Sequence, residues 1–360
     1  MIDRDRLLRT FLELVAIDSP SGAEYALAGN LMFRLVALGG NVYQDEHGNV
    51  VARWSQGRGD CLLLSAHMDT NGPDVGIRPQ VRDGVVYSNG STILGADDKS
   101  GISVILEVLH LIASGSLLAP PLELVFTVEE EMGLAGARRL DKQRLRSRHG
   151  YVVDGDGPAH RLEIGTPTKY DLSATVHGRR SHASKCPEEG VDAIRVAAEA
   201  IAAMPLGRVD MCTTANIGRL EGGSSPNMVA DEVWLRGEAR GHDLALLTAQ
   251  VDIMIGCLEG AARRHAALVD ISVTRAEMGY ALALNSPVIA LAKAAAQRSG
   301  ISLVLDRNST ATDANVFNAH GISCAVLGTG VEEKHTHQER LVIDEMFTAA
   351  ELLVQIIAVS

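Results

Sequence analysis

The spacing of apolar residues changes along the chain and predicts two kinds of folding unit. In the first part, helical spacing alternates with short apolar runs of the length of a buried strand. Helices are expected to begin near Asp5, near Gly22, at Asp97 or Asp98 and after Gly133, and strands to cover 50–54, 61–66, 122–128 and 151–153. This alternation is typical of an α/β unit with a largely parallel sheet.

From about Thr168 the order of elements changes. The pattern here predicts strands over 170–176, 213–220, 232–240 and 268–275, with helices over 187–204 and from His242. The α/β texture returns after Asn285, with a helix over 287–298, strands over 302–305 and 323–327, and a last helix from Ile343. We therefore expect a larger α/β domain with a mixed, largely parallel sheet at 1–168 and 284–360, interrupted by an inserted α+β domain at 169–283.

Composition and charge narrow the functional class. Hydrophobic residues make up 46% and charged residues 22% of the 360-residue chain, as in ordinary globular proteins. The net charge of −12 disfavours binding to a phosphate backbone, so no nucleic acid is expected as a partner. The N-terminal segment lacks the basic start and apolar run of a signal peptide, and the most apolar stretches are too short to cross a bilayer. No membrane partner is expected either.

The cysteines indicate the compartment. There are 5, they are widely scattered, and no two stand close together in the sequence. This pattern argues against a disulfide framework and against a thiolate metal site. A reducing cytoplasm fits it best.

Acidic and imidazole side chains gather where the predicted strands end. They are His67 and Asp69 after one strand, Glu129, Glu130 and Glu131 after another, and Asp154 and Asp156 after a third. In an open α/β sheet, ligands bind beyond the carboxyl ends of the strands. We expect these side chains to meet in one crevice.

Two further segments add to this crevice. Asp97 and Asp98 open a predicted helix, where the helix dipole favours negative charge, and His335 lies in the loop after the strand over 323–327. Taken singly, these residues have plainer explanations as helix caps, solvated acids or satisfied loop histidines. Together, crowded carboxylates need cations to neutralise them, and carboxylate with imidazole suits zinc. The whole set favours a dinuclear metal site.

The motif order HxD, GADDKxG, EEE(M)G, VDG and HTxxE resembles the M20 family of zinc peptidases, and is most similar to its peptidase T branch of aminotripeptidases. The resemblance covers essentially the whole chain. It implies a zinc-peptidase-like catalytic domain, an inserted lid and dimerisation domain, and two Zn²⁺ ions per subunit. The implied ligands are His67 and Asp154 for one ion, Glu131 and His335 for the other, and Asp97 as the bridge. Co²⁺ or Mn²⁺ could occupy the same ligands.

The resemblance also implies catalytic roles. Glu130 matches the general base, which takes a proton from water and later hands it to the leaving amine. Asp69 suits the role of fixing the tautomer of the His67 imidazole. The family further implies a cis peptide bond between Asp97 and Asp98.

In the inserted domain, the segment 178–183 resembles the family's GxxSHA motif, whose histidine, here His182, reaches the active site of the partner subunit. This implies a homodimer. Asn227 and Arg240 resemble residues that bind the carboxylate of the substrate, a task that suits the planar fork of arginine. Without the resemblance, His182 is an ordinary loop histidine and Arg240 a solvated strand end. The segment 312–315 resembles the family's SDAN segment near the site.

The likeness to peptidase T favours a cytoplasmic aminopeptidase acting on short peptides. Relatives on this scaffold also act as carboxypeptidases, as dipeptidases or as deacylases of N-acyl amino acids, and the metal motifs do not separate these activities. The segment between the VDG and SHA motifs is shorter here than in peptidase T. A binding or scaffold protein without metals is disfavoured because every ligand position is filled, and a serine hydrolase is disfavoured because no GxSxG elbow follows a strand.

Overall fold

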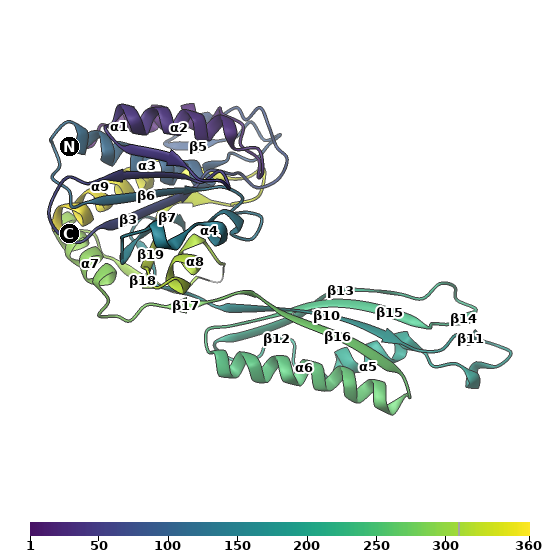
Figure 1. Ribbon diagram of the computed structural model, residues 1–360. Coiled ribbons are helices and arrows are strands. Elements are labelled where there is room, and N and C mark those ends of the chain that lie inside the picture. Colours follow the sequence, from purple (N-terminus) through teal and green to yellow (C-terminus); the bar gives the residue numbers. More distant parts are fainter. Residues whose placement is uncertain (309) are drawn as a thin grey trace. The chain divides into compact units, whose positions relative to one another are not determined.

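A large mixed sheet is the centre of the first of two units into which the chain divides in the computed structural model, which describes residues 1–308 and 310–360 (Figure 1). Unit 1 is made of Met1–Gly165 and Ala281–Ser360, and unit 2 of Thr166–Tyr280. The sequence pattern placed the corresponding boundaries at 168/169 and 283/284. The mixed α/β architecture with an inserted unit confirms the predicted fold class.

The sheet of unit 1 has parallel strands at its centre and antiparallel strands toward both edges. Its order is β1 (Asn41–Gln44), β2 (Val50–Trp54), β6 (Leu122–Thr127), β3 (Leu62–His67), β7 (His149–Asp156), β19 (Ser323–Glu332), β20 (Arg340–Val342), β5 (Val85–Tyr87) and β4 (Gln80–Arg82), with β8 (Arg161–Glu163) beside β19 and β18 (Val304–Asp306) beside β8. Strands β6, β3, β7 and β19 run parallel to one another. Their carboxyl ends therefore open at one edge of the sheet.

Helices cover both faces of these central strands. They are α1 (Arg4–Val15), α2 (Tyr25–Ala37), α3 (Ala96–Ala113), α4 (Ala135–Arg139), α7 (Pro287–Ser299), α8 (Asp313–Ala319) and α9 (Ile343–Val359), with a short turn of 3-10 helix at Lys142–Arg144. The main hydrophobic core joins α1, α2, α3, α7 and α9 to one face, and Figure 1 shows α4 and α8 on the side away from α1 and α2. Strands β3 and β6 are consequently buried along their whole length, as is typical of parallel sheets.

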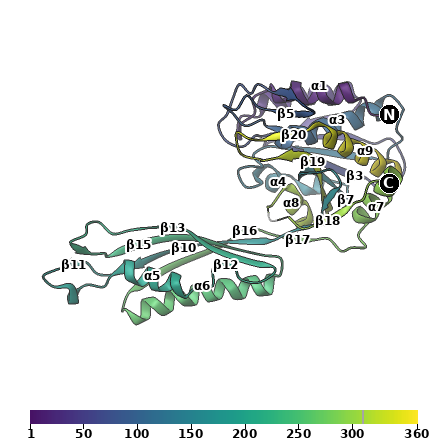
Figure 2. The ribbon, with the colours of Figure 1, turned by 180° about the vertical axis from the view of Figure 1, so that it is seen from behind.

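Unit 2 is built on an antiparallel sheet of the order β12 (Gly207–Arg208), β13 (Thr213–Gly222), β15 (Glu232–Gly241), β10 (Thr168–His177) and β16 (Leu268–Glu277). A two-stranded ribbon, β11 (Ser181–His182) with β14 (Met228–Val229), lies at one end of this unit (Figure 2). A second small pair, β9 (Gly165–Thr166) with β17 (Tyr280–Ala281), stands where the chain passes between the units.

Two helices, α5 (Ala193–Ala203) and α6 (Leu244–Arg264), cover one face of the unit 2 sheet. The helix expected over 187–204 is wrong at its start, because only a 3-10 turn forms at Pro187–Glu189 and α5 begins after Asp192. The Asp192 side chain accepts hydrogen bonds from the backbone N–H groups of Ile194 and Arg195, which fixes the helix start there.

Among the described residues, α6 is the one helix long and apolar enough by composition to cross a membrane. Leu247, Met254 and Leu258 belong to the core shared with the sheet, whereas Leu244, Leu246 and Ile253 are exposed. Its N-terminus is capped by the Asp243 side chain. The helix therefore packs one face on the sheet, and its solvent-facing side also carries apolar residues.

Candidate metal centre

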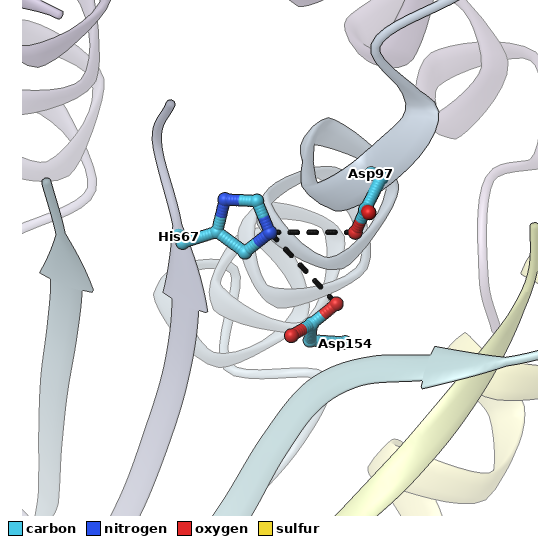
Figure 3. Close-up of side chains that lie close together, drawn as sticks. All are labelled: His67, Asp97 and Asp154. Atoms are coloured by element: carbon cyan, nitrogen blue, oxygen red, sulfur yellow. Dashed lines mark hydrogen bonds and ion pairs between the residues drawn. The ribbon is translucent and has the colours of Figure 1, made fainter. Parts of the chain in front are cut away.

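Three ligand-type side chains meet at the carboxyl edge of the parallel strands (Figure 3). His67 ends β3, Asp154 lies near the end of β7, and Asp97 stands in the first turn of α3. The Nε2 atom of His67 lies 3.3 Å from Asp97 Oδ1 and 3.9 Å from Asp154 Oδ1. All three side chains are buried. The arrangement places one imidazole nitrogen and two carboxylate oxygens around a common point.

The tautomer of His67 follows from its second nitrogen. Nδ1 lies 2.9 Å from the backbone carbonyl oxygen of Asp69, which can only accept a hydrogen bond, so Nδ1 carries the proton. The Asp69 carboxylate is more distant from Nδ1, at 3.4 Å. Nε2 is therefore the ring nitrogen that faces Asp97 and Asp154, and it is the one that would bind a metal ion.

A second group uses the other oxygen of Asp97. His335 Nε2 lies 3.2 Å from Asp97 Oδ2 and 2.9 Å from Glu131 Oε1. His335 has φ of +62°, a left-handed conformation that is uncommon for residues other than glycine and that turns the chain just beyond β19. The strand expected to end at 327 continues to Glu332, which brings His335 to the edge of the sheet. Asp97 thus stands between two groups of three side chains.

These side chains suit divalent cations. Glu131 Oε1 is buried and accepts no hydrogen bond from the described residues, although His335 Nε2 lies 2.9 Å away. A buried carboxylate oxygen beside an imidazole nitrogen costs free energy unless the imidazole is protonated or a cation lies between the two groups. Carboxylate oxygens with imidazole nitrogens are the donor set that zinc and similar metals prefer. The side chains fit divalent cations because they offer these donor atoms and because two groups of three ligand-type residues share Asp97.

A loop after β6 presents Glu130 and Glu131, and Asp69 holds it. Asp69 Oδ1 accepts the N–H of Glu130 at 2.9 Å, and Oδ2 accepts the N–H of Glu131 at 3.1 Å and the hydroxyl of Ser21 at 2.7 Å. With its carbonyl oxygen on His67, Asp69 contacts three of the predicted site residues. The side chain is fully buried, so its hydrogen bonds are not weakened by water.

The carboxylates of the cluster differ in their affinity for protons. Burial raises the pKa of Glu130 well above its usual range, and nearby Asp154, Asp313 and Glu131 add to the rise against His67. Burial likewise raises the pKa of Asp154 to about 8, opposed by Lys334. For Asp97, Lys334 and the two histidines more than offset the effect of burial, and the pKa is well below the usual range. Asp97 is therefore the carboxylate that most firmly keeps its charge.

The peptide bond between Asp97 and Asp98 is cis, which confirms that expectation. Asp98, which was predicted only to open the helix, is buried and accepts hydrogen bonds from the backbone N–H groups of His67 and Gly101. A Cβ on Gly101 would lie only 1.9 Å from the carbonyl oxygen of Val153. The first turn of α3 thus lies directly against β7, which brings Asp97 and Asp154 together.

Two other residues of the cluster were not assigned from the sequence. Glu339 accepts the N–H groups of Leu94, Gly95 and Asp97, and so holds the segment that leads into α3. Lys334 lies between Asp97 and Asp154, with its Nζ 2.9 Å from an oxygen of each. The available signals were local: Glu339 closes the HTxxE motif, and Lys334 directly precedes His335.

His182 and Asn227, predicted site residues of unit 2, come together in the two-stranded ribbon. His182 lies in β11 opposite Met228, and the N–H of Ala183 donates to the carbonyl oxygen of Asn227 at 3.0 Å. His182 Nδ1 accepts a hydrogen bond from the N–H of Ser184. The two residues therefore belong to one local structure.

Arg240 lies elsewhere in unit 2. It stands near the end of β15, nearly the whole length of that strand away from the ribbon, or about 25 Å at strand geometry. Its guanidinium donates to both oxygens of Glu238, from Nε at 2.8 Å and from Nη2 at 3.2 Å. Lys169 lies 3.5 Å from the same carboxylate. Arg240 and Asn227 of the same unit 2 therefore lie far apart, and Arg240 already has a carboxylate partner.

Comparisons with known proteins agree on one family. The family model described as Peptidase family M20/M25/M40 matches residues 63–359. The Bacillus subtilis (strain 168) protein "Uncharacterized protein YqjE" is 36% identical over 366 residues, which cover 99% of each chain. The structure of aminopeptidase PepT from Bacillus cereus ATCC 10987 matches with a TM-score of 0.96 at 37% identity, over 99% of this chain and 98% of that one. A tripeptidase from Staphylococcus aureus subsp. aureus Mu50 matches with a TM-score of 0.97 at 38% identity, over 100% and 99%.

Proposed function

Because the chain belongs to the M20/M25/M40 family of peptidases, we propose that it is a two-metal aminopeptidase that acts on short peptides with a free amino end. Family membership confirms the resemblance read from the motifs and the expectation of a hydrolase acting on peptides. The names of the two similar structures, an aminopeptidase and a tripeptidase, support the amino-end preference. The observation that carries the proposal is the pair of ligand groups that share Asp97.

Zn²⁺ is the metal we propose, with two ions per subunit. His67, Asp97 and Asp154 would hold one ion, and Asp97, Glu131 and His335 the other. Bound ions of this kind supply Lewis acidity toward a carbonyl oxygen and toward water. The mixed nitrogen and oxygen donors favour zinc over magnesium or calcium, while manganese and cobalt would accept the same donors.

Glu130 would move the proton of the reaction. Its carboxyl group is buried beside the ligand groups, and burial raises its pKa, so that it can take a proton from the attacking water and return it to the leaving amine. Asp69 would position both the base and the His67 ligand through the bonds described above. Because the Asp69 carboxylate holds the backbone of the loop, Asp69 would position Glu130 and Glu131 and would not contact the substrate.

Unit 2 would act as a lid and dimerisation domain in a cytoplasmic homodimer. His182 lies in the ribbon at one end of the unit, Asn227 directly precedes β14 of that ribbon, and Arg240 lies near the other end of β15. A dimer in which the ribbon of one subunit serves its partner would account for this separation. We propose that His182 stabilises the oxyanion and that Asn227 and Arg240 bind the carboxylate of the substrate.

The test is hydrolysis of a matched panel with and without a metal chelator. The panel contains a free tripeptide, its N-acetylated form, its C-amidated form, a dipeptide and an N-acyl amino acid. Cleavage of the free tripeptide that is lost with chelator, restored by Zn²⁺ and abolished by N-acetylation is the expected result.

The panel also separates the alternatives. Faster cleavage of the N-acetylated tripeptide or of the N-acyl amino acid would replace the aminopeptidase with a carboxypeptidase or a deacylase. Exclusive cleavage of the dipeptide would indicate a dipeptidase. Cleavage that a chelator does not affect would contradict the metal site itself.

A further inference from the structure

The metal centre contains a cation of its own. The Nζ atom of Lys334 lies 2.9 Å from Asp97 Oδ1, 2.9 Å from Asp154 Oδ1 and 3.0 Å from Asp156 Oδ1, and it donates to the backbone carbonyl oxygen of Asp154 at 3.0 Å. Its side chain is 18% exposed, whereas that of Asp156 is 44% exposed. Lys334 is therefore enclosed by carboxylates, and its most exposed partner is Asp156.

Lys334 uses the same oxygens that the first ligand group offers. The Oδ1 atoms of Asp97 and Asp154 are the atoms that face His67 Nε2, at 3.3 and 3.9 Å. A divalent ion held by His67, Asp97 and Asp154 would therefore share both carboxylate oxygens with an ammonium group. Two cations a few ångströms apart in a buried site repel each other strongly, because little water screens them.

We propose that Lys334 is a built-in counter-cation of the metal centre. Without metal, it neutralises Asp97 and Asp154 and keeps the site formed; when metal binds, it gives up these contacts and weakens the affinity of the centre. The inference rests on the proposed two-metal function and adds to it a residue that sets the metal concentration at which the enzyme becomes loaded.

Asp156 offers Lys334 an ion-pair partner that remains available when a metal ion displaces Lys334 from Asp97 and Asp154. It already contacts Nζ at 3.0 Å and lies on the more exposed side of the cluster. An ammonium group that moves toward Asp156 keeps one ion pair and frees the two oxygens that face His67. Asp156 therefore favours metal loading indirectly, by holding Lys334 in its displaced position.

The experiment measures metal affinity and stability of the full chain, with no use of activity. Apoprotein is prepared with a chelator, its affinity for Zn²⁺ is measured by competition with a chromophoric chelator, and its Tm is recorded without metal. The variants are Lys334→Met, Lys334→Arg, Asp156→Asn and the double variant. Lys142→Met, at an exposed position of unit 1, makes the same change in net charge as a matched control.

Lys334→Met should bind Zn²⁺ at least about tenfold more tightly than the wild type, and its apoprotein should melt at a lower temperature. Lys334→Arg and Lys142→Met should stay close to the wild type in affinity. Asp156→Asn should weaken Zn²⁺ binding when Lys334 is present and leave it unchanged in the Lys334→Met background, because its effect passes through Lys334.

Equal or weaker Zn²⁺ binding by Lys334→Met, or an unchanged Tm of its apoprotein, would overturn the proposal that Lys334 is a counter-cation. The same loss for Asp156→Asn in both backgrounds would overturn the role of Asp156. Failure of the proposed function is a separate result: neither wild type nor Lys334→Met would then bind Zn²⁺, while the Tm of the apoproteins would still decide whether Lys334 neutralises the cluster.

Discussion

Unit 1 and unit 2 both pack helices on a sheet, but unit 1 covers both faces of its central strands and unit 2 covers only one. Strands β3 and β6 are buried at every position, whereas β10 and β16 alternate between more and less exposed positions. In unit 1, polar side chains at the carboxyl ends of the central strands, such as His67 and Asp154, are buried. In unit 2, every second position of a strand can hold a charged residue beside water.

Because of this difference, a charged residue is stronger evidence for a functional site in unit 1 than in unit 2. Buried charges near His67 must be neutralised by one another or by a bound cation, so their presence points to chemistry. The ion pair between Arg240 and Glu238 is half-exposed and needs no such explanation. The same residue type is therefore a strong signal in unit 1 and a weak one in unit 2.

The largest effect is expected in unit 1, from Glu130→Gln. This change keeps the shape of the side chain and removes the proposed base, so turnover should fall by about 10²- to 10⁴-fold, while the proposed two equivalents of Zn²⁺ should stay bound. Turnover is measured on the free tripeptide and metal content by elemental analysis. Full turnover in this variant would remove Glu130 from the reaction.

Asp69→Asn should have the next largest effect. Asparagine retains only one of the two oxygens that hold Glu130, Glu131 and Ser21, so metal affinity or kcat should fall by about 10- to 100-fold with KM unchanged. Ser21→Ala removes a single bond to Asp69 and is the matched control, with a smaller expected loss. A rise in KM alone would instead place Asp69 in contact with the substrate.

In unit 2, Arg240→Ala would sharpen the comparison. If Arg240 binds the carboxylate of the substrate, KM for the free tripeptide should rise by about tenfold and KM for the C-amidated tripeptide should not change. Glu238→Gln frees the guanidinium from its carboxylate partner and should lower KM. Identical KM values in wild type and Arg240→Ala would show that the pair with Glu238 serves structure alone.

The smallest effect concerns stability. Glu163 is buried in unit 1, and burial, opposed by hydrogen bonds from Asn308, raises its pKa from 4.5 to about 7. A folded state that holds the proton more tightly loses stability as pH rises from 4.5 to about 7. Glu163→Gln should flatten this fall in unfolding free energy, by at most about 3 kcal/mol. Chemical denaturation at several pH values measures it, with the exposed Glu351→Gln as control; parallel curves for wild type and Glu163→Gln would contradict the prediction.

The sequence predicted the central elements of unit 1 well because a strand buried on both faces is a continuous apolar run. The strand expected at 50–54 is β2, and that expected at 61–66 is β3 shifted by one residue. The helix over 187–204 failed because the Asp192 cap outweighs the apolar spacing before it. The ligand-type residues of unit 1 could be predicted from the sequence because their motifs are local.

Residues whose contacts join distant parts of the sequence could not be predicted from local motifs. Glu339 bonds to backbone groups 242 to 245 residues earlier in the chain, and Lys334 meets Asp154 across 180 residues. No periodicity or spacing records such contacts. In unit 2, the separation of Asn227 from Arg240 depends on the length and register of β15, which motifs do not contain.

The tight backbone contact at Gly101 links formation of the candidate metal centre to the docking of α3 on β7. The point where α3 touches β7 has room for a hydrogen and no room for a methyl group, since a Cβ would meet the Val153 carbonyl oxygen at 1.9 Å. The distance between Asp97 and Asp154 is thus set by backbone meeting backbone, with no side chain between them that could yield. The centre is assembled only when the helix has docked fully on the sheet, so a bound metal ion would report completed tertiary structure, and its binding free energy would add to the stability of the fold.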